Sequence, residues 1–302
     1  MFNGFLFHHL SWYTILMWCL VTLGLILVNE LTRRKKWIAV LFFIILPIVL
    51  PFVLWLPYTA TPGTGASTGT WFHWVKVYSA LAGCIGFMLI RYNERLAENK
   101  WALMFPPLIL SLNILEACIR DFQVYGLHAT GQVIDGVVMI SGPWNIMNGI
   151  AGLLNIVAIS GWMGIRISKG RSRDMLWPDM MWFWIIAYDL WNFAYVYNCV
   201  SDHSFYAGAA LLVACTIPAF FIRRGAWLQH RAHTLALWMM FTMSVPMFVD
   251  SPTFGVPASH NPKALFVVSF IALLANILVV CYHFYRIARN KKNPLTEEVY
   301  VK

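Results

Sequence analysis

Residues 177–199 read WPDMMWFWIIAYDLWNFAYVYNC, a run apolar and aromatic enough to cross a membrane, with Asp189 and Asn192 near its middle. A charged side chain near the bilayer centre costs about 2.5–3.5 kcal/mol on insertion scales, and it needs a partner or a water-filled cavity. Such a residue is a candidate functional residue by default. The role of Asp189 therefore depends on the residues that surround it in the fold.

The overall composition is that of a membrane protein. The 302 residues are 60% hydrophobic and 16% aromatic, and only 12% are charged. Soluble domains carry about 25% charged residues. The six cysteines lie in apolar segments without a CxxC pair, and the nine histidines are scattered, so we expect no metal site and no cofactor.

Apolar runs near the length of about 17–25 residues that crosses the hydrocarbon core recur along the chain. They lie at residues 11–30, 37–57, 72–91, 101–119, 144–166, 180–200, 205–222, 234–250 and 264–286. The sequence therefore predicts an all-α fold, a polytopic bundle of about nine transmembrane helices with eight to ten as the range. Residues 1–288 would form this bundle, and residues 289–302 a polar tail.

Basic residues indicate the orientation of the bundle. All but three of the 22 Lys and Arg residues fall in alternate connections or in the C-terminal tail, and the exceptions are Lys76, Arg120 and Lys263. The positive-inside rule then places the N-terminus outside and the C-terminus in the cytoplasm. The net charge of +9 is therefore a topology signal. We expect the lipid bilayer as a partner and no nucleic acid, and the oligomeric state stays open.

Polar residues form a stripe on one face of three predicted helices, at spacings of three, four or seven residues. The stripes are Asn113, Glu116 and Arg120; Asn145, Asn148, Gly152 and Asn155; and Asp189, Asn192 and Tyr195, with Tyr188 alongside. The predicted topology places most of them in the outer half of the membrane, where Lys76 also lies.

We therefore expect an outward-facing polar cavity built on Asp189 and Glu116. Its other residues would be Asn113, Asn148, Asn155, Asn192 and Tyr195, with Lys76 and Arg120 as counter-charges. The alternative for the asparagines is a structural network of interhelical hydrogen bonds, each worth about 0.6–2 kcal/mol.

Two further groups have simpler interpretations. His230 and His233 lie close to Arg231 in WLQHRAHT, which we interpret as an interfacial turn that contacts anionic lipid headgroups. Trp182, Trp184 and Trp191 favour core packing, with a pocket for an apolar or cationic ligand as the alternative.

Five long stretches carry a resemblance to a known family. They are TGTWFHWVKVYSALAGC (68–84), FPPLILSLNILEACIRDFQVY (105–125), GPWNIMNGIAGLLN (142–155), residues 177–199, and RRGAWLQHRAHTLALWMMF (223–241). The chain resembles an uncharacterised family of bacterial inner-membrane proteins, a domain of unknown function, nearly end to end. The resemblance implies a multi-pass protein of the bacterial plasma membrane and no particular activity.

Three classes of function stay open. The favoured one is a transporter or permease-like protein for a small solute or ion, with Asp189 and Glu116 as proton- or cation-coupling carboxylates, although the chain shows no inverted repeat. The second is a membrane-embedded enzyme acting on a lipid or another apolar substrate, with Lys76 or Arg120 stabilising negative charge, although no catalytic constellation stands out. The third is a membrane sensor or scaffold.

Overall fold

The computed structural model describes residues 4–57, 71–127, 131–134 and 137–300, and these are mostly helical. The α-helices are α1 (Trp12–Arg34), α2 (Lys36–Val40), α3 (Leu46–Leu50), α5 (Trp71–Tyr92), α6 (Glu94–Glu98), α7 (Phe105–Leu127), α8 (Pro143–Val157), α9 (Trp182–Cys199), α10 (Leu211–Phe221), α11 (Trp227–Ser244), α12 (Met247–Asp250) and α13 (Pro262–Asn290). Short 3-10 or π segments are η1 (Leu41–Ile45), η2 (Pro51–Trp55), η4 (Ala102–Met104), η5 (Ser201–His203) and η6 (Ser204–Ala210). The strands form two antiparallel pairs, β1 (Gln132–Ile134) with β2 (Val137–Met139) and β3 (Arg166–Ile167) with β4 (Met175–Leu176).

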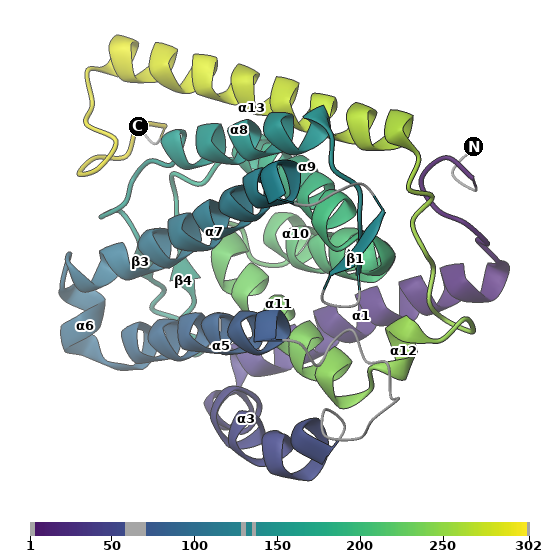
Figure 1. Cartoon of the computed structure of the whole chain (residues 1–302). Helices are drawn as coiled ribbons and strands as arrows, with labels where there is room; N and C mark the ends of the chain where they lie inside the picture. Colours follow the sequence, from purple (N-terminus) through teal and green to yellow (C-terminus); the bar gives the residue numbers. More distant parts are fainter. Residues whose placement is uncertain (1–3, 58–70, 128–130, 135–136, 301–302) are drawn as a thin grey trace.

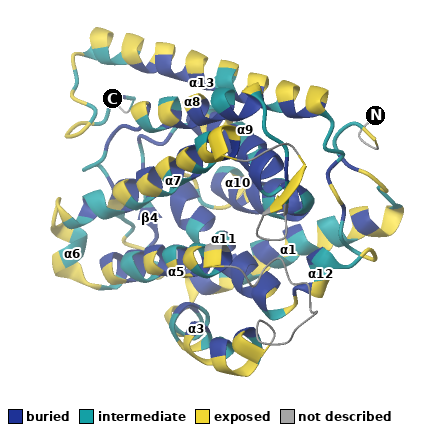
Figure 2. Ribbon diagram, viewed as in Figure 1, coloured by how far each residue is buried: buried dark blue, intermediate teal, exposed yellow. Residues whose placement is uncertain are grey.

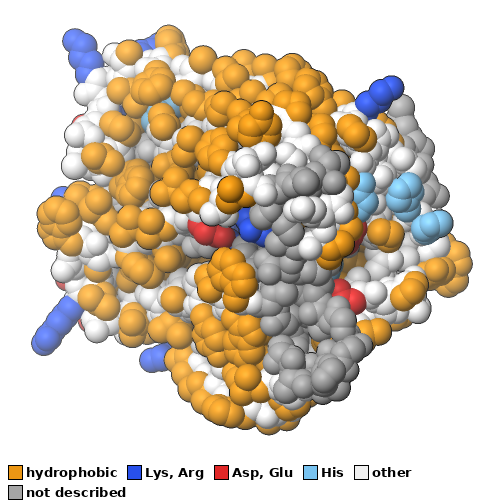
Figure 3. Space-filling view, in the orientation of Figure 1, with side chains coloured by type: hydrophobic (Ala, Val, Ile, Leu, Met, Phe, Trp, Pro, Cys, Tyr) orange, Lys and Arg blue, Asp and Glu red, His pale blue; other side chains and the backbone are white. Residues whose placement is uncertain are grey.

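Six helical segments of the described chain are long and apolar enough to cross a membrane, judged by length and composition. They are Trp12–Arg34, Lys36–Trp55, His73–Tyr92, Ala102–Leu127, Ser201–Phe221 and Pro262–Asn290. Their outward faces are apolar, as the exposed leucines and isoleucines of α1 and α13 show, and hydrophobic side chains form broad patches on the face seen in Figure 3. A soluble protein would bury such faces, so the fold fits an integral membrane protein.

Helix α9 lies inside the bundle. It packs against α7, α8, α10, α13 and η6, and most of its residues are buried, as Figures 1 and 2 show. Because its side chains contact other helices rather than the surroundings, it can carry Tyr, Trp, Asn and Asp where an outer helix carries Leu and Ile. The run at 177–199 is therefore helical, but its polar residues belong to an interior helix.

Two other predicted runs differ from the observed helices. Helix α8 ends at Val157, so the run predicted at 144–166 is too long, and the chain continues through a turn into β3. Helix α11 begins at Trp227 rather than at residue 234, and it ends at Ser244, before the four-residue α12. The predicted turn at His230 and His233 is therefore wrong: both side chains are buried in α11 and bond to Asn29 and Thr32 of α1.

Basic residues from several predicted connections meet at one end of the bundle, around Asp174. Arg33 Nη1 lies 2.9 Å from both carboxylate oxygens of Asp174, and Arg223 Nε lies 3.0 Å from Oδ2. Arg91 is fully buried and donates to the carbonyl oxygens of Arg33, Ser172 and Arg173. These connections thus share one side of the bundle. Which side of a membrane it faces stays a prediction.

The C-terminal segment packs on the bundle instead of extending from it. Asp179 accepts hydrogen bonds from the backbone N–H groups of Val299 (2.8 Å) and Tyr300 (2.7 Å). Val299 is fully buried, and the Tyr300 hydroxyl lies 2.8 Å from Nδ1 of His283. The polar residues 289–300 therefore belong to the folded unit.

Candidate functional site

A cavity of about 140 Å³ lies between α5, α7, α9 and α11. Its polar lining comes from His73, Lys76 and Ser79 of α5, Asn113 of α7, Tyr188, Asn192 and Tyr195 of α9, Arg231 and Thr242 of α11, and His203 of η5. Four predicted site residues therefore lie around one cavity, namely Lys76, Asn113, Asn192 and Tyr195. The described lining includes no Asp or Glu, so the cavity differs in composition from one built on carboxylates.

Arg231 is the most unusual lining residue, because its guanidinium is buried beside neutral partners. The residue is 7% exposed; Nε donates to the Tyr188 hydroxyl (3.3 Å) and Nη2 to Asn192 Oδ1 (3.2 Å). Nη1 is buried and meets no hydrogen-bond acceptor among the described residues. A buried charge normally requires a partner of opposite charge. The cavity therefore holds a positive charge whose hydrogen-bonding capacity the described part of the chain leaves partly unused.

Lys76 and Glu116 form an ion pair that joins α5 to α7. The Lys76 side chain lines the cavity, whereas Glu116 is not a lining residue and its side chain is 43% exposed. The pair thus lies at the edge of the cavity, and the Glu116 carboxylate balances the Lys76 charge there.

Asp189 faces away from the cavity, toward α10. Its Oδ2 accepts a hydrogen bond of 2.7 Å from Thr216, whose hydroxyl in turn lies 3.3 Å from Trp227 Nε1. Its Oδ1 is buried without a hydrogen-bond partner among the described residues. Asp189 nevertheless interacts electrostatically with Arg231, so the carboxylate lies behind the cavity wall, near the buried guanidinium.

Asn148 and Asn155 point into contacts between helices rather than into the cavity. Asn155 donates to Asn276 of α13 at 2.8 Å, a direct interhelical hydrogen bond. Asn148 donates to Asp121 at 2.7 Å, and Asn145 donates to the same carboxylate at 3.1 Å. This is the structural network that the sequence offered as the alternative, and at its centre is Asp121, which the sequence reading did not single out. Arg120, the residue before Asp121, is half-buried and does not line the cavity.

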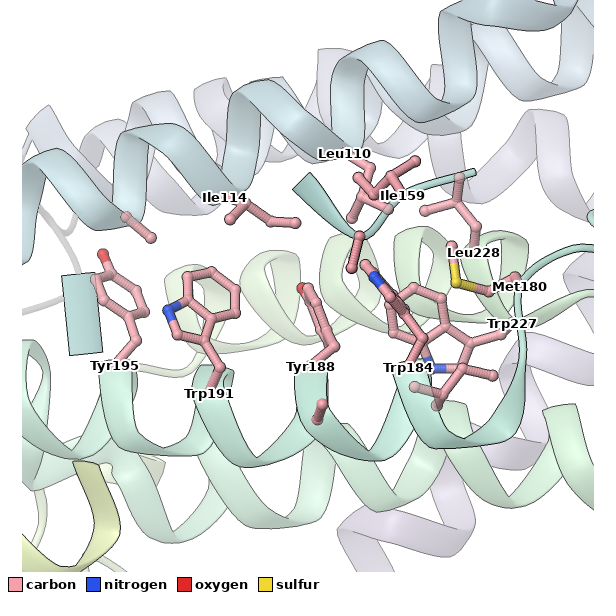
Figure 4. Close-up of a cluster of buried hydrophobic side chains, with 14 of the residues drawn as sticks. Leu110, Ile114, Ile159, Met180, Trp184, Tyr188, Trp191, Tyr195, Trp227 and Leu228 are labelled. Atoms are coloured by element: carbon pink, nitrogen blue, oxygen red, sulfur yellow. The ribbon is translucent and has the colours of Figure 1, made fainter. Parts of the chain in front are cut away.

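Aromatic side chains of α9 form one wall of the site. Figure 4 shows Trp184, Tyr188, Trp191 and Tyr195 projecting from the same face of α9, toward Leu110 and Ile114. Their spacing of three or four residues places them in a row, with neighbouring ring centroids 5.4–6.2 Å apart. The Trp184 and Trp191 indoles also donate to backbone carbonyls of α8, at Asn155 and Asn148. Both interpretations therefore hold in part, since Trp191 lines the cavity and Trp184 packs in the core. For Trp182 both are wrong, because its side chain is 64% exposed at the start of α9.

Arg231 is the main cavity residue that sequence reasoning missed. We counted it with the basic residues of a cytoplasmic connection, because Arg223 and Arg224 precede it closely. The available signal was the helical spacing of Trp227, Arg231, Thr234 and Trp238, which extends the apolar run about two turns further back than its hydropathy suggests. Among the described residues, no group of three His, Cys, Asp or Glu side chains comes together as metal ligands do.

Comparison with known proteins gives a family for this chain and no activity. Residues 8–302 match the family described as "Family of unknown function (DUF5692)". This match spans nearly the whole sequence, so the chain belongs to that family. No curated protein and no solved structure matches.

Proposed function

We propose that this member of the family is a permease-like membrane protein that binds a small solute in the cavity between α5, α7, α9 and α11. The observation that carries the proposal is the cavity itself, which lies within a bundle of apolar helices and combines charged, amide, hydroxyl and aromatic side chains from four helices. Binding sites of solute carriers lie inside the helix bundle, where polar side chains are shielded from lipid.

Asp189 is the residue we propose for proton coupling. It lies in a buried helix, one of its oxygens has no hydrogen-bond partner among the described residues, and it interacts electrostatically with Arg231. A solute that brings a charge close to Arg231 would change the electrostatic interaction between Arg231 and Asp189. It would thereby change how readily Asp189 takes up a proton. Glu116 is a weaker candidate, because it already pairs with Lys76 and is partly exposed.

The cavity can be tested with a substitution that fills it. Gly83 lines the cavity, and a Cβ atom placed there meets nothing within 4 Å. The first atom of a larger side chain at this position therefore meets no neighbour, and we expect the rest of a Leu side chain to occupy part of the cavity. Gly24 of α1 is a matched control, because a Cβ there also meets nothing within 4 Å and the residue does not line the cavity.

We expect the wild-type protein in liposomes to take up at least one solute from a panel of small anions, cations and neutral compounds. Gly83→Leu should abolish this uptake, and Gly24→Leu should leave it intact. The proposal fails if no solute enters, or if both glycine variants transport as the wild type does while remaining folded.

A further inference from the structure

We infer that the solute bound in this cavity is a small organic anion, whose anionic group contacts Arg231 and whose apolar body lies against the aromatic wall of α9. The inference rests on the proposed function and names the class of solute.

The first argument is the unused hydrogen-bonding capacity of Arg231. A guanidinium has five N–H donors. Two of them meet acceptors, at Tyr188 and Asn192, and Nη1 meets none among the described residues. Tyr188 and Asn192 hold the guanidinium in one orientation, and the buried Nη1 is the donor that they leave without an acceptor. A carboxylate or phosphate oxygen would satisfy it, and arginine binds these groups through two parallel hydrogen bonds.

The second argument is the sign of the charge in the cavity. Lys76 and Arg231 are the lysine and the arginine of the cavity lining, and no Asp or Glu occurs in the described lining. Glu116 balances Lys76 at the edge. Asp189 interacts electrostatically with Arg231, but its Oδ2 is bonded to Thr216 of α10 and its Oδ1 has no hydrogen-bond partner among the described residues, so Arg231 donates no hydrogen bond to it there. A cationic solute would be repelled by the guanidinium, whereas an anion would accept the hydrogen bonds that Tyr188 and Asn192 leave unused.

The third argument is the size and character of the space. A volume of about 140 Å³ is close to the roughly 150 Å³ of an apolar cavity that holds benzene. Trp191 and Tyr195 of α9 and Trp238 of α11 contribute aromatic surface. The cavity thus fits one ring or a short branched chain with a single anionic group, and it is too small to enclose a lipid acyl chain.

Three probes of equal size and different charge test the inference. Benzoate, benzamide and benzylamine are titrated into the purified full-length protein, and binding is followed by the rise in Tm and by calorimetry. We expect benzoate to bind and to raise Tm with concentration, and the neutral and cationic probes to have no effect. Binding of benzamide or benzylamine as tight as that of benzoate would overturn the inference.

Variants of Arg231 test whether the anionic group of benzoate contacts this residue. Arg231→Gln should weaken benzoate binding by about tenfold or more, as expected for the loss of hydrogen bonds to a charged group. Arg231→Lys should bind with intermediate affinity, because lysine keeps the charge without the planar fork. Unchanged benzoate affinity in folded Arg231→Gln would show that the anion lies elsewhere. If that variant does not fold, the three-probe comparison on the wild type still decides.

Failure of the anion inference can be distinguished from failure of the proposed permease-like function. If Gly83→Leu blocks the uptake of a cationic or neutral solute only, the permease-like function stands and the anion inference is wrong. If no solute of the panel is taken up and none of the three probes binds, both are wrong.

Discussion

Replacement of Asp174 by Asn should be among the most destabilising single-atom changes in this protein. The Asp174 side chain is 1% exposed and is held by Arg33 Nη1 at 2.9 Å, by Ser172 Oγ at 2.7 Å and by the nearby charge of Arg223 at 3.0 Å. Arg33 is itself only 6% exposed. Asp174→Asn keeps the shape of the side chain and removes its charge, so Arg33 is left buried with less compensation.

Removing one partner of a buried ion pair costs about 3–5 kcal/mol. We expect the lower end, about 3 kcal/mol, because Glu30 still pairs with Arg33 and the Asn oxygen still accepts a hydrogen bond. Glu94→Gln is the matched control. Its carboxylate lies 3.5 Å from Arg173 and is 82% exposed, and pairs of that kind contribute about 0–1 kcal/mol.

The assay is the free energy of unfolding of both variants and the wild type in the same detergent, from denaturant titrations. We expect Asp174→Asn to lose about 3 kcal/mol and Glu94→Gln to stay close to the wild type. If the unfolding free energies of the two variants agree within about 1 kcal/mol, the buried ion pair of Asp174 with Arg33 does not stabilise the bundle as its burial requires.

The pH dependence gives a second check on the same residue. Burial by itself raises the pKa of Asp174, but hydrogen bonds from Ser172 and Arg33 and the charges of Arg33 and Arg91 outweigh it and lower this pKa below its usual value. The contribution is therefore complete above the unfolded pKa of about 3.9 and is lost as the pH falls through the lowered folded pKa. The stability gap between wild type and Asp174→Asn should stay constant from about pH 5 to 8. A gap that closes within that range would contradict this assignment.

Three further predictions concern packing, the C-terminal segment and coupling. Gly152→Leu should lower the free energy of unfolding by about 1–3 kcal/mol through overpacking, because a Cβ there comes within 2.6 Å of Trp191 Nε1. A free energy of unfolding equal to that of the wild type would show that α8 and α9 can move apart at no cost. Asp179→Asn replaces one of two acceptor oxygens that hold the C-terminal segment, so amide hydrogen exchange near Val299 should accelerate, and wild-type exchange rates would count against the docking. Asp189→Asn should abolish solute-dependent proton uptake into liposomes while solute binding persists, and proton uptake equal to that of the wild type would exclude Asp189 as the coupling group.

The sequence by itself determined the helical, apolar character of the chain and the existence of polar helix faces. Length, hydropathy and spacing are local properties. An apolar run inside a bilayer forms a helix because its backbone N–H and C=O groups find no water there and must bond to one another. The same local reasoning identified Lys76, Asn113, Asn192 and Tyr195, which lie around one cavity.

Only the tertiary structure decided which polar residues share that cavity. Asp189 and Asn192 are three residues apart, and since an α-helix turns about 100° per residue, their directions differ by about 60°. The neighbours of α9 separate them: Asp189 meets Thr216 of α10, whereas Asn192 meets Arg231 of α11. Arg231 was assigned to a cytoplasmic connection because counting charges cannot show how deep a helix begins. The sign of the charge in the cavity therefore depends on how the helices pack, and a local sequence pattern does not indicate that packing.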